Sequence, residues 1–222
     1  MAITLGNLTS SLKNQTLSIN NGKEKFHRAA SLARKIGKGI LEIESRGNLP
    51  LLLDSKYIKE WKRDSSVRFL RPIERPDFAI QAREGKLFQQ DHPYCTKGEP
   101  GKPSSHAFVL SPQNQLYAAP IQPGKFHHSS FCAGGAVTFA GEMETDSQGK
   151  IVMISSRSGH YRPQKQHLLQ ALRILENWGI DLKSVELQEY DSLNPNRFSQ
   201  FLSAKTYLDT LGSCPANRVF SF

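Results

Sequence analysis

Hydrophobic positions recur at three- and four-residue steps in the first part of the chain. Residues 23–45 place apolar side chains on one helical face and basic side chains on the others, which predicts a basic amphipathic helix. Gly47 is expected to end it. A short second helix is expected over residues 55–63, before Pro72 and Pro76 break any further helix.

From residue 78 onward the pattern changes to short alternating or apolar runs bounded by turn residues. Such runs are typical of an antiparallel meander, and they predict strands at 78–82, 86–88, 107–110, 115–119, 136–144, 150–155 and 185–187. Helical spacing returns over residues 163–178, with Gly179 as the stop, and again in a closing helix that starts at Asn194. The strands cluster between helices without regular β-α alternation. The expected class is therefore α+β: a twisted antiparallel sheet flanked by a basic helical N-terminal part and two C-terminal helices.

The length of 222 residues suits one domain with an appendage. We expect a Ser- and Asn-rich flexible leader over residues 1–22, a basic helical part over 23–75 and an α+β core over 76–222, the last two forming one compact domain. The leader lacks the apolar region of a secretory signal peptide. No apolar stretch is long enough for a membrane span.

Charge is distributed unevenly along the chain. Lys and Arg number 29 against 20 Asp and Glu, a net charge of +9, and residues 1–90 hold 17 of the basic and 9 of the acidic side chains. This excess predicts an acidic partner for the first half: a phosphate surface, an anionic membrane face or an acidic protein such as calmodulin. A solvated helix face that only improves solubility is the alternative. Nucleic acid is disfavoured because the basic residues are not interleaved with exposed aromatic ones.

Residues with chemical potential concentrate between positions 127 and 163. Residues 127–132 combine two imidazoles, two hydroxyls and a thiol just before a Gly-Gly pair, and Glu142 lies within an apolar run. Residues 157–163 lead into a helix N-terminus, whose free N–H groups and flanking arginines suit an anion. The candidates in these segments are His127, His128, Ser129, Ser130, Cys132, Glu142, Ser158, His160, Tyr161 and Arg162.

Several chemistries fit these residues, and spacing fixes none of them. Ser129 or Ser130 as nucleophile, His160 as base and Glu142 as orienting acid would follow triad logic. Cys132 paired with a histidine would make a thiol variant. A carboxylate near hydroxyl, imidazole and phenol groups would suit an ADP-ribosyltransferase that uses NAD. In the structural alternative, the histidines pin tight turns and the serines satisfy turn backbone.

Four segments together resemble the shared core of the plant IQ-motif calmodulin-binding proteins. They are Phe108-Val109-Leu110-Ser111, His128-Ser129-Ser130-Phe131-Cys132-Ala133-Gly134-Gly135, Ala140-Gly141 and Ser158-Gly159-His160-Tyr161-Arg162-Pro163. Segments of the same kind are also expected in proteins of host-associated bacteria, and the likeness extends from about Phe78 to Leu187.

This resemblance implies association with calmodulin or a host protein more than a reaction. The family has Leu at the position of Cys132, which weakens Cys132 as a nucleophile, and often has a basic residue at the position of Glu142. Ile80-Gln81-Ala82-Arg83 starts like an IQ motif but lacks the later basic residues. A calmodulin contact would therefore have to use the basic helix, residues 25–43.

Taken together, these features lead to one hypothesis and one alternative. The hypothesis is a bacterial effector, secreted into the host cytoplasm, with a polar cleft that transfers a group to a host protein, ADP-ribosyl transfer from NAD being favoured. Its catalytic residues would be His128, Ser129, Glu142, His160 and Tyr161; Ser130, Ser158 and Arg162 would bind the cofactor, and no metal is expected. The alternative is a cytoplasmic, non-catalytic module that binds calmodulin or another acidic host protein through helix 25–43.

Overall fold

The computed structural model describes residues 33–34, 36–54, 66–97, 104–191, 194 and 196–212. The expected leader 1–22, the first part of the basic helix and the expected helix 55–63 lie outside the described residues.

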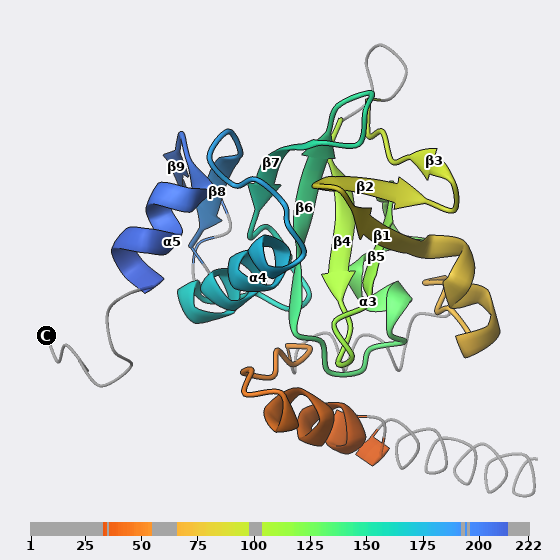
Figure 1. Cartoon of the computed structure of the whole chain (residues 1–222). Helices are drawn as coiled ribbons and strands as arrows, with labels where there is room; N and C mark the ends of the chain where they lie inside the picture. Colours follow the sequence, from red (N-terminus) through yellow and green to blue (C-terminus); the bar gives the residue numbers. More distant parts are fainter. Residues whose placement is uncertain are drawn as a thin grey trace, which may run out of the picture.

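One curled sheet of nine strands organises the described part of the chain (Figure 1). Its order is β3-β2-β1-β5-β4-β6-β7-β8-β9, and every pairing is antiparallel except that of β7 with β8, between which helix α4 crosses. The expected α+β class is confirmed. The strands are β1 Ala79–Arg83, β2 Lys86–Gln89, β3 His92–Pro93, β4 His106–Leu110, β5 Leu116–Ala119, β6 Phe139–Thr145, β7 Ile151–Ser155, β8 Glu186–Tyr190 and β9 Phe198–Phe201.

Both faces of the sheet are covered, and strand β4 shows this in its side chains. Phe108 and Leu110 belong to the larger apolar cluster, which lies under α4 (Lys165–Asn177) and α5 (Ala204–Gly212). Ala107 and Val109 belong to a second cluster on the opposite face. Because successive side chains of a strand point to opposite faces, a strand buried on both sides needs the continuous apolar run seen here.

Most expected strands are found within one or two residues, but three segments differ. Residues 72–78 form a 3-10 helix, η1 (Pro72–Phe78), because proline is well suited to a first helical turn. Strand β3 lies between the expected strands 86–88 and 107–110, where the sequence analysis predicted none. The closing helix starts at Ala204 and not at Asn194, since Phe198–Phe201 pairs with the edge of β8, where Phe198 stacks on Tyr190.

The N-terminal helix, residues 36–45, lies beyond the end of the sheet and is drawn in orange in Figure 1. Ile43 anchors it with a fully buried side chain, and Gly47 at φ +72° ends it as expected. The following chain runs along the core, where Leu51 forms an antiparallel bridge with Val137. Within the described residues, no helix is both long and apolar enough to cross a membrane.

Candidate functional site

Helix α3 (His128–Phe131) is a single turn that carries the first half of the polar motif into the interior. The His128 side chain is buried, and its Nε2 lies 2.8 Å from the carbonyl oxygen of Gly141 on β6. A carbonyl oxygen only accepts, so Nε2 carries the hydrogen and donates it. Burial lowers the pKa of His128 to about 4, although this hydrogen bond opposes the shift. His128 is therefore a neutral residue that fastens α3 to the sheet.

Ser129 and His160, which are 31 positions apart in the sequence, are brought together. The Ser129 Oγ lies 3.0 Å from His160 Nδ1, and the His127 ring packs edge-on against His160 with centroids 4.9 Å apart. Burial, with the nearby His127 adding to it, lowers the pKa of His160 to about 4. A base of that pKa is weak at neutral pH, and Ser129 is 4% exposed. The pair has the contact of a catalytic dyad without the basicity or the access.

Ser130, Ser158 and Tyr161 bind backbone groups. The Ser130 Oγ accepts the N–H of His127 at 3.0 Å, and its carbonyl accepts the N–H of Leu70 at 2.9 Å. The Ser158 Oγ accepts the N–H of Tyr161 at 3.4 Å. The buried Tyr161 hydroxyl donates to the carbonyl of Gly135 at 2.8 Å, and burial raises its pKa. These contacts use the Ser130 and Ser158 hydroxyls that the sequence offered to a cofactor and the Tyr161 hydroxyl that it offered to catalysis.

Arg162 has a carboxylate as its neighbour. Its guanidinium lies 3.3 Å from Asp54, and the N–H of Asp54 donates to the carbonyl of His160 at 2.9 Å. The cation expected at an anion site before α4 is thus paired within the chain. The sequence analysis did not single out Asp54, because 108 positions separate it from Arg162.

Glu142 lies on β6 with partners of its own. It is 7% exposed, accepts a hydrogen bond from Ser105 Oγ at 3.1 Å and lies 3.8 Å from the Arg157 guanidinium. Burial raises its pKa, while Arg157 and Ser105 oppose that shift. His160 contacts Ser129 and His127, whereas Glu142 contacts Ser105 and Arg157. The contacts therefore do not assemble the Ser-His-Glu triad that the sequence suggested.

Cys132 follows α3 and has an apolar environment. It is buried within the second apolar cluster, and burial raises the pKa of its thiol to about 11. A thiol with that pKa stays protonated at neutral pH and is a poor nucleophile. This environment suits the Leu that the resemblance places at the same position in the plant family.

A cleft of about 580 Å³ is present at another place on the sheet, near the β2–β3 edge. Its lining includes Tyr94, whose hydroxyl lies 2.7 Å from His106 Nδ1, together with Phe78 and Cys95. None of the site residues expected from the sequence lines this cleft. The polar motif is accordingly a buried network and not the wall of this cleft.

We call His128, Ser129, Ser130, His160 and Tyr161 the His-Ser junction. Its side chains and backbone join α3 to β6, to the turn before α4, and to the segments that contain Asp54 and Leu70. A geometry that satisfies buried polar groups on several segments at once favours a structural role. The junction thus lies in an α+β domain, and its polar groups bond to several segments of that domain.

Comparison with known proteins identifies the segment that carries this junction. Residues 74–168 match the family model described as IQ motif-containing protein middle domain. The resemblance to the plant IQ-motif family is confirmed over these residues.

The relatives include three proteins of Arabidopsis thaliana. The chain is 35% identical to IQ domain-containing protein IQM3 over 130 residues, which is 57% of this chain and 28% of that protein. It is 33% identical to IQM1 over 142 residues (62% and 28%) and 30% identical to IQM4 over 138 residues (60% and 25%). The matched part thus spans only about a quarter of each relative. No solved structure matches the chain.

These findings correct the main hypothesis from the sequence. The relatives are plant proteins named for an IQ domain, so the interpretation as a bacterial effector, as a transferase and as a protein secreted into a host cell was wrong. The error has a physical origin. His, Ser and Glu side chains near one another in sequence suit catalysis and buried hydrogen bonding equally well, and only their exposure and partners separate the two.

One residue that the sequence analysis did not single out also matters. Gln170 of α4 is buried; its side-chain amide donates to the carbonyls of Leu49 and Thr138, and its oxygen accepts the N–H of Leu49. A signal was present: a polar residue at a core position of the helix, between Leu169 and Ala171, needs buried partners.

Proposed function

We propose that this chain is a non-catalytic, calmodulin-binding module in which the basic helix 25–43 makes the contact and the His-Ser junction is structural. The observation that carries the proposal is the difference in solvent exposure between the polar motif and the N-terminal helix. Most of the polar motif that suggested catalysis is buried, its His160 is half-buried, and its groups bond within the chain, whereas cationic side chains of the N-terminal helix are exposed.

The described part of the helix has the chemistry that an acidic helix-binding partner requires. Arg34 and Lys38 are exposed. Ile36, Ile40 and Ile43 follow the i, i+4, i+7 spacing with which amphipathic helices enter an apolar groove. Calmodulin presents such a groove with acidic surroundings, so opposite charge adds to apolar contact.

The segment that begins like an IQ motif supports the choice of helix by exclusion. Ile80-Gln81-Ala82-Arg83 lies in strand β1, which is paired with β2 on one side and with β5 on the other. A helical calmodulin target cannot form there without breaking the sheet. The resemblance to a calmodulin-binding family therefore directs attention to the N-terminal helix.

Charge reversal tests this proposal. The Arg34→Glu/Lys38→Glu variant should weaken binding of Ca²⁺-calmodulin by about tenfold at low salt, because two attractive charges become repulsive. Isothermal titration calorimetry on the full chain measures the change.

The matched control is Lys165→Glu/Lys183→Glu, which alters net charge equally at two exposed lysines outside the helix. It should change the affinity by less than about twofold if the contact is local. Equal loss in both variants, or no calmodulin binding by the unmodified chain, would refute the proposal.

A further inference from the structure

The N-terminal helix is seated tightly on the core by one of its faces. A Cβ placed on Gly39 would lie 3.1 Å from the Ala136 Cβ and 3.4 Å from the Pro112 Cγ, which shows how closely the helix backbone approaches this surface. Ile43, one turn further on, is fully buried. We call Pro112 and Ala136 the seat of the helix.

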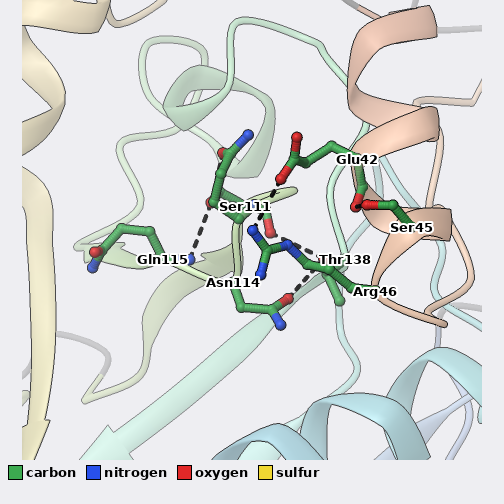
Figure 2. A network of polar contacts seen from close by, with 8 residues as sticks. Glu42, Ser45, Arg46, Ser111, Asn114, Gln115 and Thr138 are labelled. Atoms are coloured by element: carbon green, nitrogen blue, oxygen red, sulfur yellow. Dashed lines mark hydrogen bonds and ion pairs between the residues drawn. The ribbon is translucent and has the colours of Figure 1, made fainter.

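The seat is a braced turn. Figure 2 shows the end of the helix, with Glu42, Ser45 and Arg46, beside the turn between β4 and β5. The Ser111 Oγ accepts the N–H groups of residues 113 and 115, and the Thr138 hydroxyl, 3.2 Å from the Asn114 side chain, donates to the Ser111 carbonyl at 2.9 Å. The turn that receives the helix is therefore held by hydrogen bonds that do not involve the helix.

The chain after the helix is clamped to the same structure, and we call residues 48–54 the strap. Gln170 exchanges two 2.9 Å hydrogen bonds with the backbone of Leu49 and a third, of 2.6 Å, with the carbonyl of Thr138. Leu51 and Val137 exchange backbone hydrogen bonds of 2.9 and 3.0 Å. One network thus links the seat, α4 and the strap.

The face that the helix uses for this docking is the face that a calmodulin groove would take. Ile43 is completely covered, and Ile36 and Ile40 on the same side are half-buried. The same three side chains would be the anchors for an apolar groove. They cannot be buried in both places at once.

We infer that the N-terminal helix exchanges between its seat and calmodulin, so that calmodulin binding lifts residues 36–45 and loosens the strap. The inference rests on the proposed calmodulin contact and adds its regulation. Docking competes with binding, so the apparent dissociation constant equals the intrinsic dissociation constant divided by the fraction of molecules whose helix is not seated. Calmodulin in turn uncovers Pro112, Ala136 and Val137, an apolar surface that the resting molecule hides.

The first experiment changes the clamp and leaves the helix sequence intact. Gln170→Leu removes both hydrogen bonds to Leu49 and should tighten Ca²⁺-calmodulin binding by the full chain by about tenfold. Gln89→Leu is the matched control, because it removes a side-chain-to-backbone hydrogen bond, to the Asp77 carbonyl, on the far strands of the sheet. It should leave the affinity unchanged.

The second readout is amide hydrogen exchange of the unmodified chain with and without Ca²⁺-calmodulin, and with calmodulin in EGTA as a reference. Protection at the Val137 amide, which donates to Leu51, should fall on binding, while the helix becomes more protected.

The outcomes separate the two ideas. Binding with unchanged Val137 protection and unaltered affinity in Gln170→Leu would overturn the exchange and leave the calmodulin contact standing. Absence of binding in both the unmodified chain and Gln170→Leu would overturn the contact and the exchange together.

Discussion

At the scale of single residues, burial decides what the histidines do. His128 and His160 sit within hydrogen-bond distance of Gly141 and Ser129, and desolvation lowers both pKa values to about 4. Burial also lowers the pKa of the half-buried His127. Neutral imidazoles of this kind act as uncharged hydrogen-bonding groups. Their proximity in space says nothing of catalysis until exposure is known.

These pKa values predict a loss of stability in mild acid. As the pH falls, these histidines take up protons near pH 6.5 in the unfolded chain but only near pH 4 in the folded chain. The free energy of unfolding should therefore be largest above pH 6.5 and decrease as the pH drops toward 4. His128→Gln keeps a donor for Gly141 without titrating in this range. Urea denaturation between pH 4 and 7.5 should show a shallower pH dependence for this variant than for the unmodified chain.

The control for this prediction is His92→Gln, at an exposed position on β3. It should leave the pH dependence as it is. A His128→Gln variant whose stability falls as steeply with acid as the unmodified chain would contradict the assignment of the effect to His128.

At the scale of elements, the hydrogen bonds of the polar motif depend on backbone groups as well as on side chains. Gly141 lies where β6 is paired with β4 on one side and approaches β7 on the other, and its carbonyl holds His128. A Cβ here would overlap the carbonyl oxygen of Ser155 and come within 2.8 Å of the Phe139 ring. Backbone cannot move aside as a flexible side chain can, so this position admits only glycine.

Gly141→Ala is therefore expected to be severely destabilising, by more than about 3 kcal/mol, through overpacking at the centre of the sheet and displacement of the His128 acceptor. Thermal unfolding followed by circular dichroism measures it. Gly37→Ala is the matched control, since a Cβ there meets no atom within 4 Å and the residue lies in a helix. The control should be neutral or slightly stabilising; similar losses in both would show that Gly141 is not specially constrained.

At the scale of the whole molecule, residues 51, 54 and 70 in the described part of the first third of the chain are bonded to the sheet domain. Backbone hydrogen bonds join Leu51 to Val137, Asp54 to His160 and Leu70 to Ser130. The partners in these three pairs are 86, 106 and 60 positions apart in the sequence, respectively. Contacts of this range make the stability of one segment depend on the other. The expectation, made from the sequence, that the basic helical part and the core form one compact domain stays a prediction.

Calorimetry tests that expectation. The full chain should unfold in a single transition whose calorimetric and van't Hoff enthalpies agree, because the His-Ser junction would be lost together with the contacts of residues 51, 54 and 70. Two resolved transitions, one of which disappears on removal of residues 1–75, would instead show that the basic helical part and the core are separate units.

Local pattern was sufficient for much of the fold. Apolar alternation located β1, β2 and β4 to β8, and helical spacing located α4, because both patterns reflect the burial of neighbouring positions on one face. The closing helix was placed too early, since Phe198 and Phe201 have helical spacing but meet the edge of β8. The residues of the polar motif were singled out from the sequence, yet their partners Asp54 and the Gly141 carbonyl were not.

The sequence by itself determined the α+β class, the positions of most strands, the concentration of His and Ser residues in one segment and the resemblance to the IQ-motif family. Only the tertiary structure decided that the His-Ser junction is buried except for the half-buried His160, that Glu142 contacts Ser105 and Arg157, and that the apolar face of the N-terminal helix is already occupied. The physical reason is the separation in sequence over which each property is determined. Periodicity and turn chemistry act over a few residues, whereas solvent exposure, pKa and hydrogen-bond partners depend on groups that the fold brings together from tens of positions away.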